Sequence, residues 1–159
     1  LLIGERIPAE LLRAGDTAME LPGLDEVGDD DSAVLHVVAG QLLAEAVGPI
    51  DLALVSTALR AQMTFDLASA ALSVVRRRDE PGLYLAAPKV MLEYVRRCEA
   101  DTLLLVAHNP GTEDLAEALS GVGQAKFPTA AFDVLRADVP FSGWKPGCAR
   151  LAEFTVARG

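Results

Sequence analysis

The stretch TLLLVAHNPG, residues Thr102–Gly111, decides the fold class of this chain. Its first six residues form a short, continuously apolar run, as expected of a strand buried on both faces of a parallel sheet. A second run of the same kind, IDLALV, covers residues 50–55 and is followed by Ser56-Thr57-Ala58-Leu59-Arg60. A shorter apolar run, Leu1–Ile3, begins the chain. We expect these three runs to be strands of one sheet.

Helical patterns separate the strands. Apolar residues recur every three or four positions in four segments, residues 32–47, 58–72, 88–98 and 109–119. Strand and helix alternate, which predicts an α/β fold: a three-layer, doubly wound, mostly parallel sheet with helices on both faces. Residues 131–137 and 149–156 alternate loosely and predict a C-terminal antiparallel hairpin at the sheet edge. Residues 7–30 are expected to be a long loop, and the basic run at 76–78 a solvated helix end.

Composition limits the classes of function. A length of 159 residues with 51% hydrophobic content predicts a single domain over residues 1–159. The sequence has no apolar run of about 18 residues and no visible secretory signal, so we expect a cytoplasmic protein that neither crosses a membrane nor binds one. Its net charge of −9 argues against nucleic acid as a partner. A few local cations are still enough to hold a small phosphorylated ligand.

The strand ends carry the chemistry. Ligands of parallel sheets bind beyond the carboxyl ends of the strands, so Arg6, Arg60 and His108 are expected at one edge. Asn109 is expected to cap the following helix, whose amino terminus favours an anion. An arginine can grip phosphate oxygens with two hydrogen bonds, so these four residues predict a phosphate pocket. The alternative is that His108 is simply a hydrogen-bonded histidine at a strand end.

Several segments resemble one family in order and spacing. STALRAQMT (56–64) is similar to the Ser-Ser-Pro-Ala-Leu-Arg-Ala-Arg-Gln-Thr segment of SixA-type phosphohistidine phosphatases, a branch of the histidine phosphatase superfamily with a phosphoglycerate-mutase-like fold. LYLAAPKVMLEYVRR (83–97) and TLLLVAHNPGTEDLAEALSG (102–121) resemble two further segments of that family, the second of which contains its Val-Gly-His-Asn-Pro-Gly motif. FPTAAFDVL and the GWKPGCARLAEF tail resemble its closing strands. The resemblance implies that Arg60 and His108 occupy two phosphate-pocket positions.

The resemblance fails at the catalytic pair. The family has an Arg-His dipeptide at the end of its first strand, and that histidine takes the phosphoryl group. The matching place in LLIGERIPA reads Glu5-Arg6, or Arg6-Ile7 if the register shifts by one, so neither alignment supplies the histidine. Glu5 would repel a phosphate and is a candidate blocker of the pocket. His36 is the one other histidine and is expected to be a partly buried helix residue.

Two functions from different classes remain. The first is a non-catalytic pseudophosphatase, a binding or regulatory domain whose partner is a phosphorylated small molecule, a phosphoprotein or another protein surface. The second is an active phosphatase for phosphohistidine or a small phosphoester with an altered mechanism, in which His108 is the catalytic candidate. Ser56 and Thr57 have no adjacent base visible in the sequence. Neither a cofactor nor a metal is expected in either case.

Overall fold

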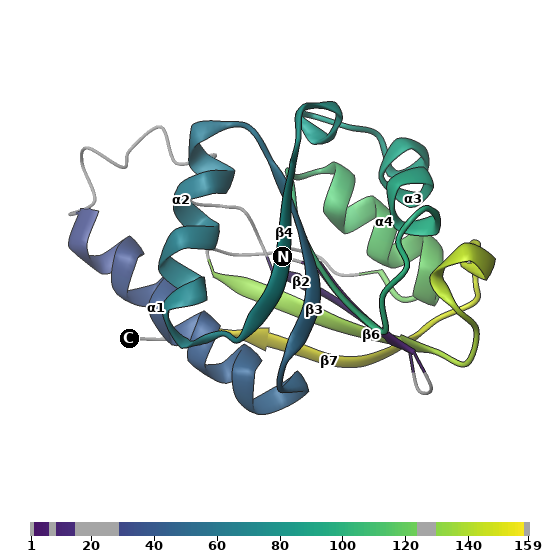
Figure 1. The fold of residues 1–159 in the computed structure, drawn as a ribbon, viewed down its shortest axis with the longest axis horizontal. Helices are drawn as coiled ribbons and strands as arrows, with labels where there is room; N and C mark the ends of the chain where they lie inside the picture. The colour runs from purple at the N-terminus through teal and green to yellow at the C-terminus, as the bar shows by residue number, and fades with distance from the viewer. Residues whose placement is uncertain (1, 7–8, 15–28, 124–129, 158–159) are drawn as a thin grey trace.

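The computed structural model describes residues 2–6, 9–14, 29–123 and 130–157, which form one sheet with helices on both faces (Figure 1). The strands are β1 (Leu2–Arg6), β2 (Ala9–Ala14), β3 (Ile50–Ser56), β4 (Val74–Glu80), β5 (Thr102–Val106), β6 (Ala131–Ala137) and β7 (Arg150–Val156). The helices are α1 (Asp29–Val47), α2 (Leu59–Ala68), α3 (Pro88–Arg96) and α4 (Gly111–Ser120). Three short 3₁₀ turns join them, η2 (Ser69–Ala71), η3 (Pro81–Leu83) and η4 (Phe141–Gly143).

The sheet has the strand order β4-β3-β5-β2-β1-β6-β7. β4, β3, β5 and β2 run parallel to one another, whereas β1 is antiparallel to β2 and parallel to β6. β7 closes the far edge as the antiparallel partner of β6. The predicted mostly parallel α/β sheet and its C-terminal antiparallel edge hairpin are therefore confirmed.

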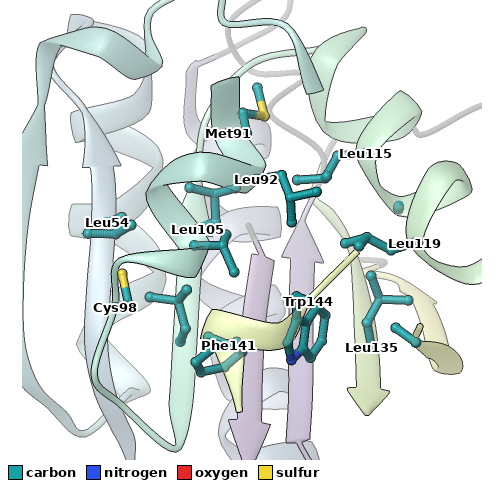
Figure 2. Close-up of a cluster of buried hydrophobic side chains, with 14 of the residues drawn as sticks. Leu54, Met91, Leu92, Cys98, Leu105, Leu115, Leu119, Leu135, Phe141 and Trp144 are labelled. Atoms are coloured by element: carbon teal, nitrogen blue, oxygen red, sulfur yellow. The ribbon is translucent and has the colours of Figure 1, made fainter. Parts of the chain in front are cut away.

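Two apolar cores lie on opposite faces of the sheet, because successive strand residues point to opposite sides. Leu54 of β3 and Leu105 of β5 face α3 and α4, where Phe141 and Trp144 complete the cluster (Figure 2). Val55 and Val106, one position further along the same strands, face the α1 and α2 side. Burial on both faces is what the continuous apolar runs predicted.

The layer of α1 and α2 is packed closely. Gly40 of α1 lies so near the backbone of α2 that a Cβ at this position would collide with the carbonyl oxygen of Ala68. On the other face, Trp144 is fully buried, and its indole Nε1 donates a hydrogen bond of 3.1 Å to the carbonyl oxygen of Val139. None of the helices in the described ranges has the length and hydropathy of a membrane span.

Two sequence expectations about secondary structure are wrong. The basic run at 76–78 belongs to the edge strand β4 and is not a helix end, because this segment pairs through its backbone with β3. Its exposed side chains lack the apolar pattern that identifies a buried strand. The expected loop at 7–30 contains β2. Helix α1 already begins at Asp29, so the acidic residues Asp29-Asp30-Asp31 belong to its first turn.

Candidate functional site

The carboxyl ends of β3 and β5 lie side by side at one end of the strands. Val55 lies beside Val106 in the parallel ladder. Ser56, the last residue of β3, and His108, two residues after the end of β5, therefore come to the same end of the sheet. The Oγ atom of Ser56 lies 2.8 Å from Nε2 of His108, and both residues are buried. The Tyr84 ring, from the turn after β4, lies nearly perpendicular to the imidazole, with the ring centroids 5.4 Å apart. The structure thus gives His108 a serine partner that sequence spacing did not indicate.

His108 is held in its neutral form at physiological pH. Burial of the imidazole, together with the positive charge of Arg60, lowers the pKa of His108 to about 4. A neutral imidazole has one nitrogen that can accept a hydrogen bond, so Nε2 can take the proton of the Ser56 hydroxyl.

Gln62 ties this edge together. It lies one turn into α2, two residues after Arg60, and its Nε2 donates a 2.8 Å hydrogen bond to the carbonyl oxygen of Ser56. The same side chain contacts Asp79 at 3.2 Å and accepts a hydrogen bond from Arg77, both on β4. Gln62 therefore fixes the end of β3 relative to the edge strand.

Asn109 and the start of α4 form another part of the site. The amide nitrogen of Thr112 donates to the carbonyl oxygen of His108 at 3.0 Å, and its hydroxyl donates to Oδ1 of Asn109. α4 begins at Gly111 with Pro110 in the capping position, so it starts two residues after the predicted Asn109. The amino terminus of α4 still points its partial positive charge at the edge that holds His108.

A hollow of about 280 Å³ opens beside His108 and Asn109. Its other wall comes from the turn that leads into α3, including Leu85 and Pro88, and Asp114 of α4 also lines it. Arg60 is exposed and is not among the residues that line this hollow. Within the described ranges, no group of three or more His, Cys, Asp or Glu residues is placed to hold a metal ion.

The direction of β1 places Glu5 and Arg6 at the other end of the strands from His108. β1 runs antiparallel to β2, and Arg6 lies beside Ala137, the last residue of β6. Ala137 is in turn paired with Ala9 at the start of β2. At about 3.3 Å per strand residue, the start and end of β2 are roughly 16 Å apart. The expectation that Arg6 joins Arg60 and His108, and that Glu5 blocks their pocket, is therefore wrong.

β2, and not the first apolar run of the sequence, is the parallel neighbour of β5. It runs parallel to β5, with Arg13 opposite Leu105, and ends at Ala14. The dipeptide at this strand end is therefore Arg13-Ala14. The sequence signal for it was present: LLRAG at 11–15 is a short apolar run followed by an arginine, but the strand is brief and lay inside the presumed loop.

His36, the other histidine, is buried in α1. Its neighbours along the helix, Leu35 and Val38, pack against the core on the α1 and α2 face of the sheet. This is the helix position that the sequence predicted, although the side chain is more completely buried than expected.

A mostly parallel sheet covered on both faces, with a His-Asn-Pro-Gly turn after a central strand, is the arrangement expected of the phosphoglycerate-mutase-like class of α/β fold. No family model matches the chain, and no curated protein is similar to it in sequence. Solved structures are similar, and their descriptions name the phosphohistidine phosphatase SixA. The chain therefore has the SixA fold, and the resemblance drawn from its motifs is confirmed at this level.

Three of these structures show the extent of the likeness. A candidate phosphohistidine phosphatase SixA from Nakamurella multipartitia has a TM-score of 0.72 and 23% identity, over 81% of this chain and 83% of that one. One from Agrobacterium tumefaciens has a TM-score of 0.60 and 25% identity, over 78% of each chain. The protein histidine phosphatase SixA complexed with tungstate has a TM-score of 0.61 and 21% identity, over 81% of this chain and 80% of that one.

Proposed function

We propose that this chain is a SixA-like protein of the histidine phosphatase superfamily that lacks the nucleophilic histidine, and that it binds a phosphorylated partner without hydrolysing it. One observation carries the proposal. β2, which runs parallel to β5 with Arg13 opposite Leu105, ends in Arg13-Ala14, and the family resemblance places Arg-His at the end of a strand in this position. An alanine has no lone pair to attack phosphorus, and loss of a nucleophile lowers the rate of some hydrolases by on the order of 10⁶.

The remaining groups support binding of a phosphate. Arg60 supplies a permanent positive charge, and the amino terminus of α4 adds a partial one. A phosphate held nearby would oppose the depression of the His108 pKa, because its negative charge favours the imidazolium. His108 would then take up a proton and donate a charge-assisted hydrogen bond to the ligand. We expect phosphate binding to be accompanied by proton uptake.

The rim of the site favours a phosphoprotein over a small phosphorylated molecule. Leu59, next to Arg60, is 74% exposed, and Leu85, in the lining of the hollow, is 62% exposed. Tyr84 is also exposed, and its ring packs against that of His108 in a T-shaped arrangement. Exposed apolar side chains around a hollow that also holds His108 and Asn109 are typical of protein contact surfaces. Tungstate, bound in one structural relative, is a tetrahedral oxyanion like phosphate, in keeping with an oxyanion site on this fold.

The decisive experiment restores the missing side chain. Ala14→His should give measurable turnover of para-nitrophenyl phosphate or of a phosphohistidine peptide, whereas the unaltered protein should stay at background. Ala14→Gln adds similar bulk without a nucleophile and should also stay at background. The double variant Glu5→Arg with Arg6→His is a matched control, since it places the same dipeptide at the opposite edge of the sheet. Clear turnover by the unaltered protein would contradict the proposal.

Binding is tested separately from turnover. Arg60→Ala should weaken phosphate affinity in calorimetry roughly ten- to a hundredfold, because a charge-assisted hydrogen bond contributes about 1.5–3 kcal/mol. Arg150→Ala removes an exposed arginine on β7, away from the site, and should leave the affinity unchanged. If both variants bind phosphate equally well, the phosphate lies elsewhere.

A second candidate function rests on the contact between Ser56 and His108. A neutral His108 could take the Ser56 proton while Oγ forms a bond to phosphorus and the bond to the leaving group breaks. The proton would pass to the leaving group, and water would then hydrolyse the phosphoserine. The complete burial of Ser56 counts against this route. Ser56→Ala separates the two functions, because it would abolish any turnover of the unaltered protein that follows this path.

A further inference from the structure

A second hollow, larger than the one beside His108, lies at the other end of the strands, where β3 and β4 begin. Its volume is about 590 Å³, and it shares no lining residue with the hollow beside His108. It is bounded by the starts of β3 and β4, the end of α3 with the turn that follows, and η4. The residues that line it are Asp51, Val75, Arg76, Arg96, Arg97, Cys98, Glu99, Ala100, Asp101, Pro140, Phe141 and Ser142.

Three arginines converge on this hollow, which we call the arginine pocket. Arg76 donates a 3.0 Å hydrogen bond to the carbonyl oxygen of Glu99, and Nε of Arg96 donates one of 2.6 Å to the carbonyl oxygen of Trp144. Backbone carbonyls are neutral, so these bonds orient the two guanidinium groups without cancelling their charge. The third arginine, Arg97, follows directly after α3.

No ion pair within the described part of the chain neutralises the three arginines of the pocket. The ion pairs of this region join Arg77 to Asp66 and Asp79, and Arg78 to Glu80. These neighbouring arginines of β4 are therefore compensated, whereas those of the pocket are not. Uncompensated guanidinium groups that are already positioned favour an oxyanion, since each can give two parallel hydrogen bonds.

The acidic residues of the lining restrict which anion fits. Asp51 is occupied, because its Oδ2 accepts hydrogen bonds of 2.9 and 3.0 Å from the backbone nitrogens of Asp101 and Thr102. The side chains of Glu99 and Asp101 stand at the exposed rim. Together with the net charge of −9, they disfavour a long polyanion and leave room for a compact one.

Apolar surface beside the arginines suits the carbon skeleton of a small molecule. Val75 is 71% exposed on the edge strand, and Pro140 lines the hollow opposite it. Stabilisation of the carboxyl end of α3 by cations would account for Arg96 and Arg97 alone. It does not account for Arg76, which comes from β4, or for the hollow between these elements.

We propose that the arginine pocket binds a small organic molecule carrying two or more negative charges, as phosphate or carboxylate groups. The arginine pocket lies at the other end of the strands from His108, so a ligand bound there would act on the protein independently of the phosphate site. Binding at the arginine pocket does not require that the chain hydrolyses phosphate.

Trp144 provides the readout. It is the single tryptophan of the chain, it is buried, and its carbonyl oxygen is bonded to Arg96. A ligand that draws Arg96 into new contacts should change the indole fluorescence. Inorganic pyrophosphate and citrate are the two probes, the first for phosphate chemistry and the second for carboxylate chemistry. At least one should give a saturable change that weakens with added salt.

Two variants locate the binding. Arg76→Gln combined with Arg97→Gln should lower the affinity for the active probe at least roughly tenfold, because two charge-assisted contacts are lost. Both side chains are exposed, so the fold should persist, which circular dichroism checks. Arg150→Gln, on β7, should leave the fluorescence titration unchanged. The proposal is overturned if neither probe gives saturable binding at millimolar concentration, or if only Arg60→Ala weakens it.

Discussion

Titration of His108 offers the sharpest test of the site. The pKa of this imidazole lies at about 4 in the folded protein, against an ordinary value near 6.5. Burial is the larger cause and the charge of Arg60 the next, and both disfavour the imidazolium. The unfolded chain therefore binds more protons than the folded one between pH 4 and 6.5, and stability falls as the pH drops through this window.

The size of the effect follows from the shift. A displacement of about 2.5 pKa units corresponds to roughly 3 kcal/mol when the window has been fully crossed. From pH 7 to pH 5, the neutral His108 should cost the protein about 2 kcal/mol of unfolding free energy. His108→Gln has no titrating group, so its loss over the same interval should be smaller by that amount.

Two measurements check this reasoning. Urea denaturation at pH 7 and pH 5 compares the unaltered protein with His108→Gln. Proton NMR of the imidazole signals gives the midpoint directly, and His36→Gln identifies the His108 signal because the chain has two histidines. A midpoint near 6.5 would refute the account of a buried imidazole beside Arg60. Inorganic phosphate should move the midpoint upward, and Arg60→Ala should raise it even without phosphate.

Three further outcomes concern stability. Gly40→Ala should cost about 1–3 kcal/mol in urea denaturation by forcing α1 away from α2, whereas Gly143→Ala, whose Cβ would meet only ordinary contacts, should change stability by less than about 0.5 kcal/mol. Trp144→Ala should cost about 3–5 kcal/mol, followed by circular dichroism because the fluorophore is lost. Arg77→Ala should cost about 1 kcal/mol or less despite its ion pair with Asp66, since both side chains are partly exposed; a loss above about 2 kcal/mol would show that the pair is a structural requirement.

The central strands could be predicted from the sequence because burial on both faces leaves a distinctive apolar run. β3 and β5 lie within one residue of the predicted segments, and β6 has the predicted bounds. β4 was missed because most of its side chains are charged and exposed, so its sequence contains no buried apolar run. Strand pairing of this kind is decided by the sheet and leaves no period-two pattern in the sequence.

The site could be predicted in part. Arg60 and His108 come from segments with specific motifs, and each follows a strand whose direction is fixed by the parallel sheet. The failure at Arg6 came from assuming that the first apolar run is a parallel neighbour of β5. In the structure β1 runs antiparallel to β2, and β2 is the parallel neighbour of β5. A local sequence pattern does not reveal which of two strands pairs with β5. The contact of Ser56 with His108 joins residues that are 52 positions apart in the sequence. Predicting it would have required the pairing register of β3 and β5.

The hydrogen bond between Ser56 and His108 spans two interior strands, neither of which lies at an edge of the sheet. Fraying of β4 would release Asp79 and Arg77 from Gln62 but would leave the ladder between β3 and β5 closed. Backbone amides of these two strands should therefore exchange with deuterium only through near-global opening, whereas those of β4 should exchange early. The imidazole is thus held by the slowest-opening part of the molecule, and its surroundings should persist in mild denaturant after the edge strand has come away.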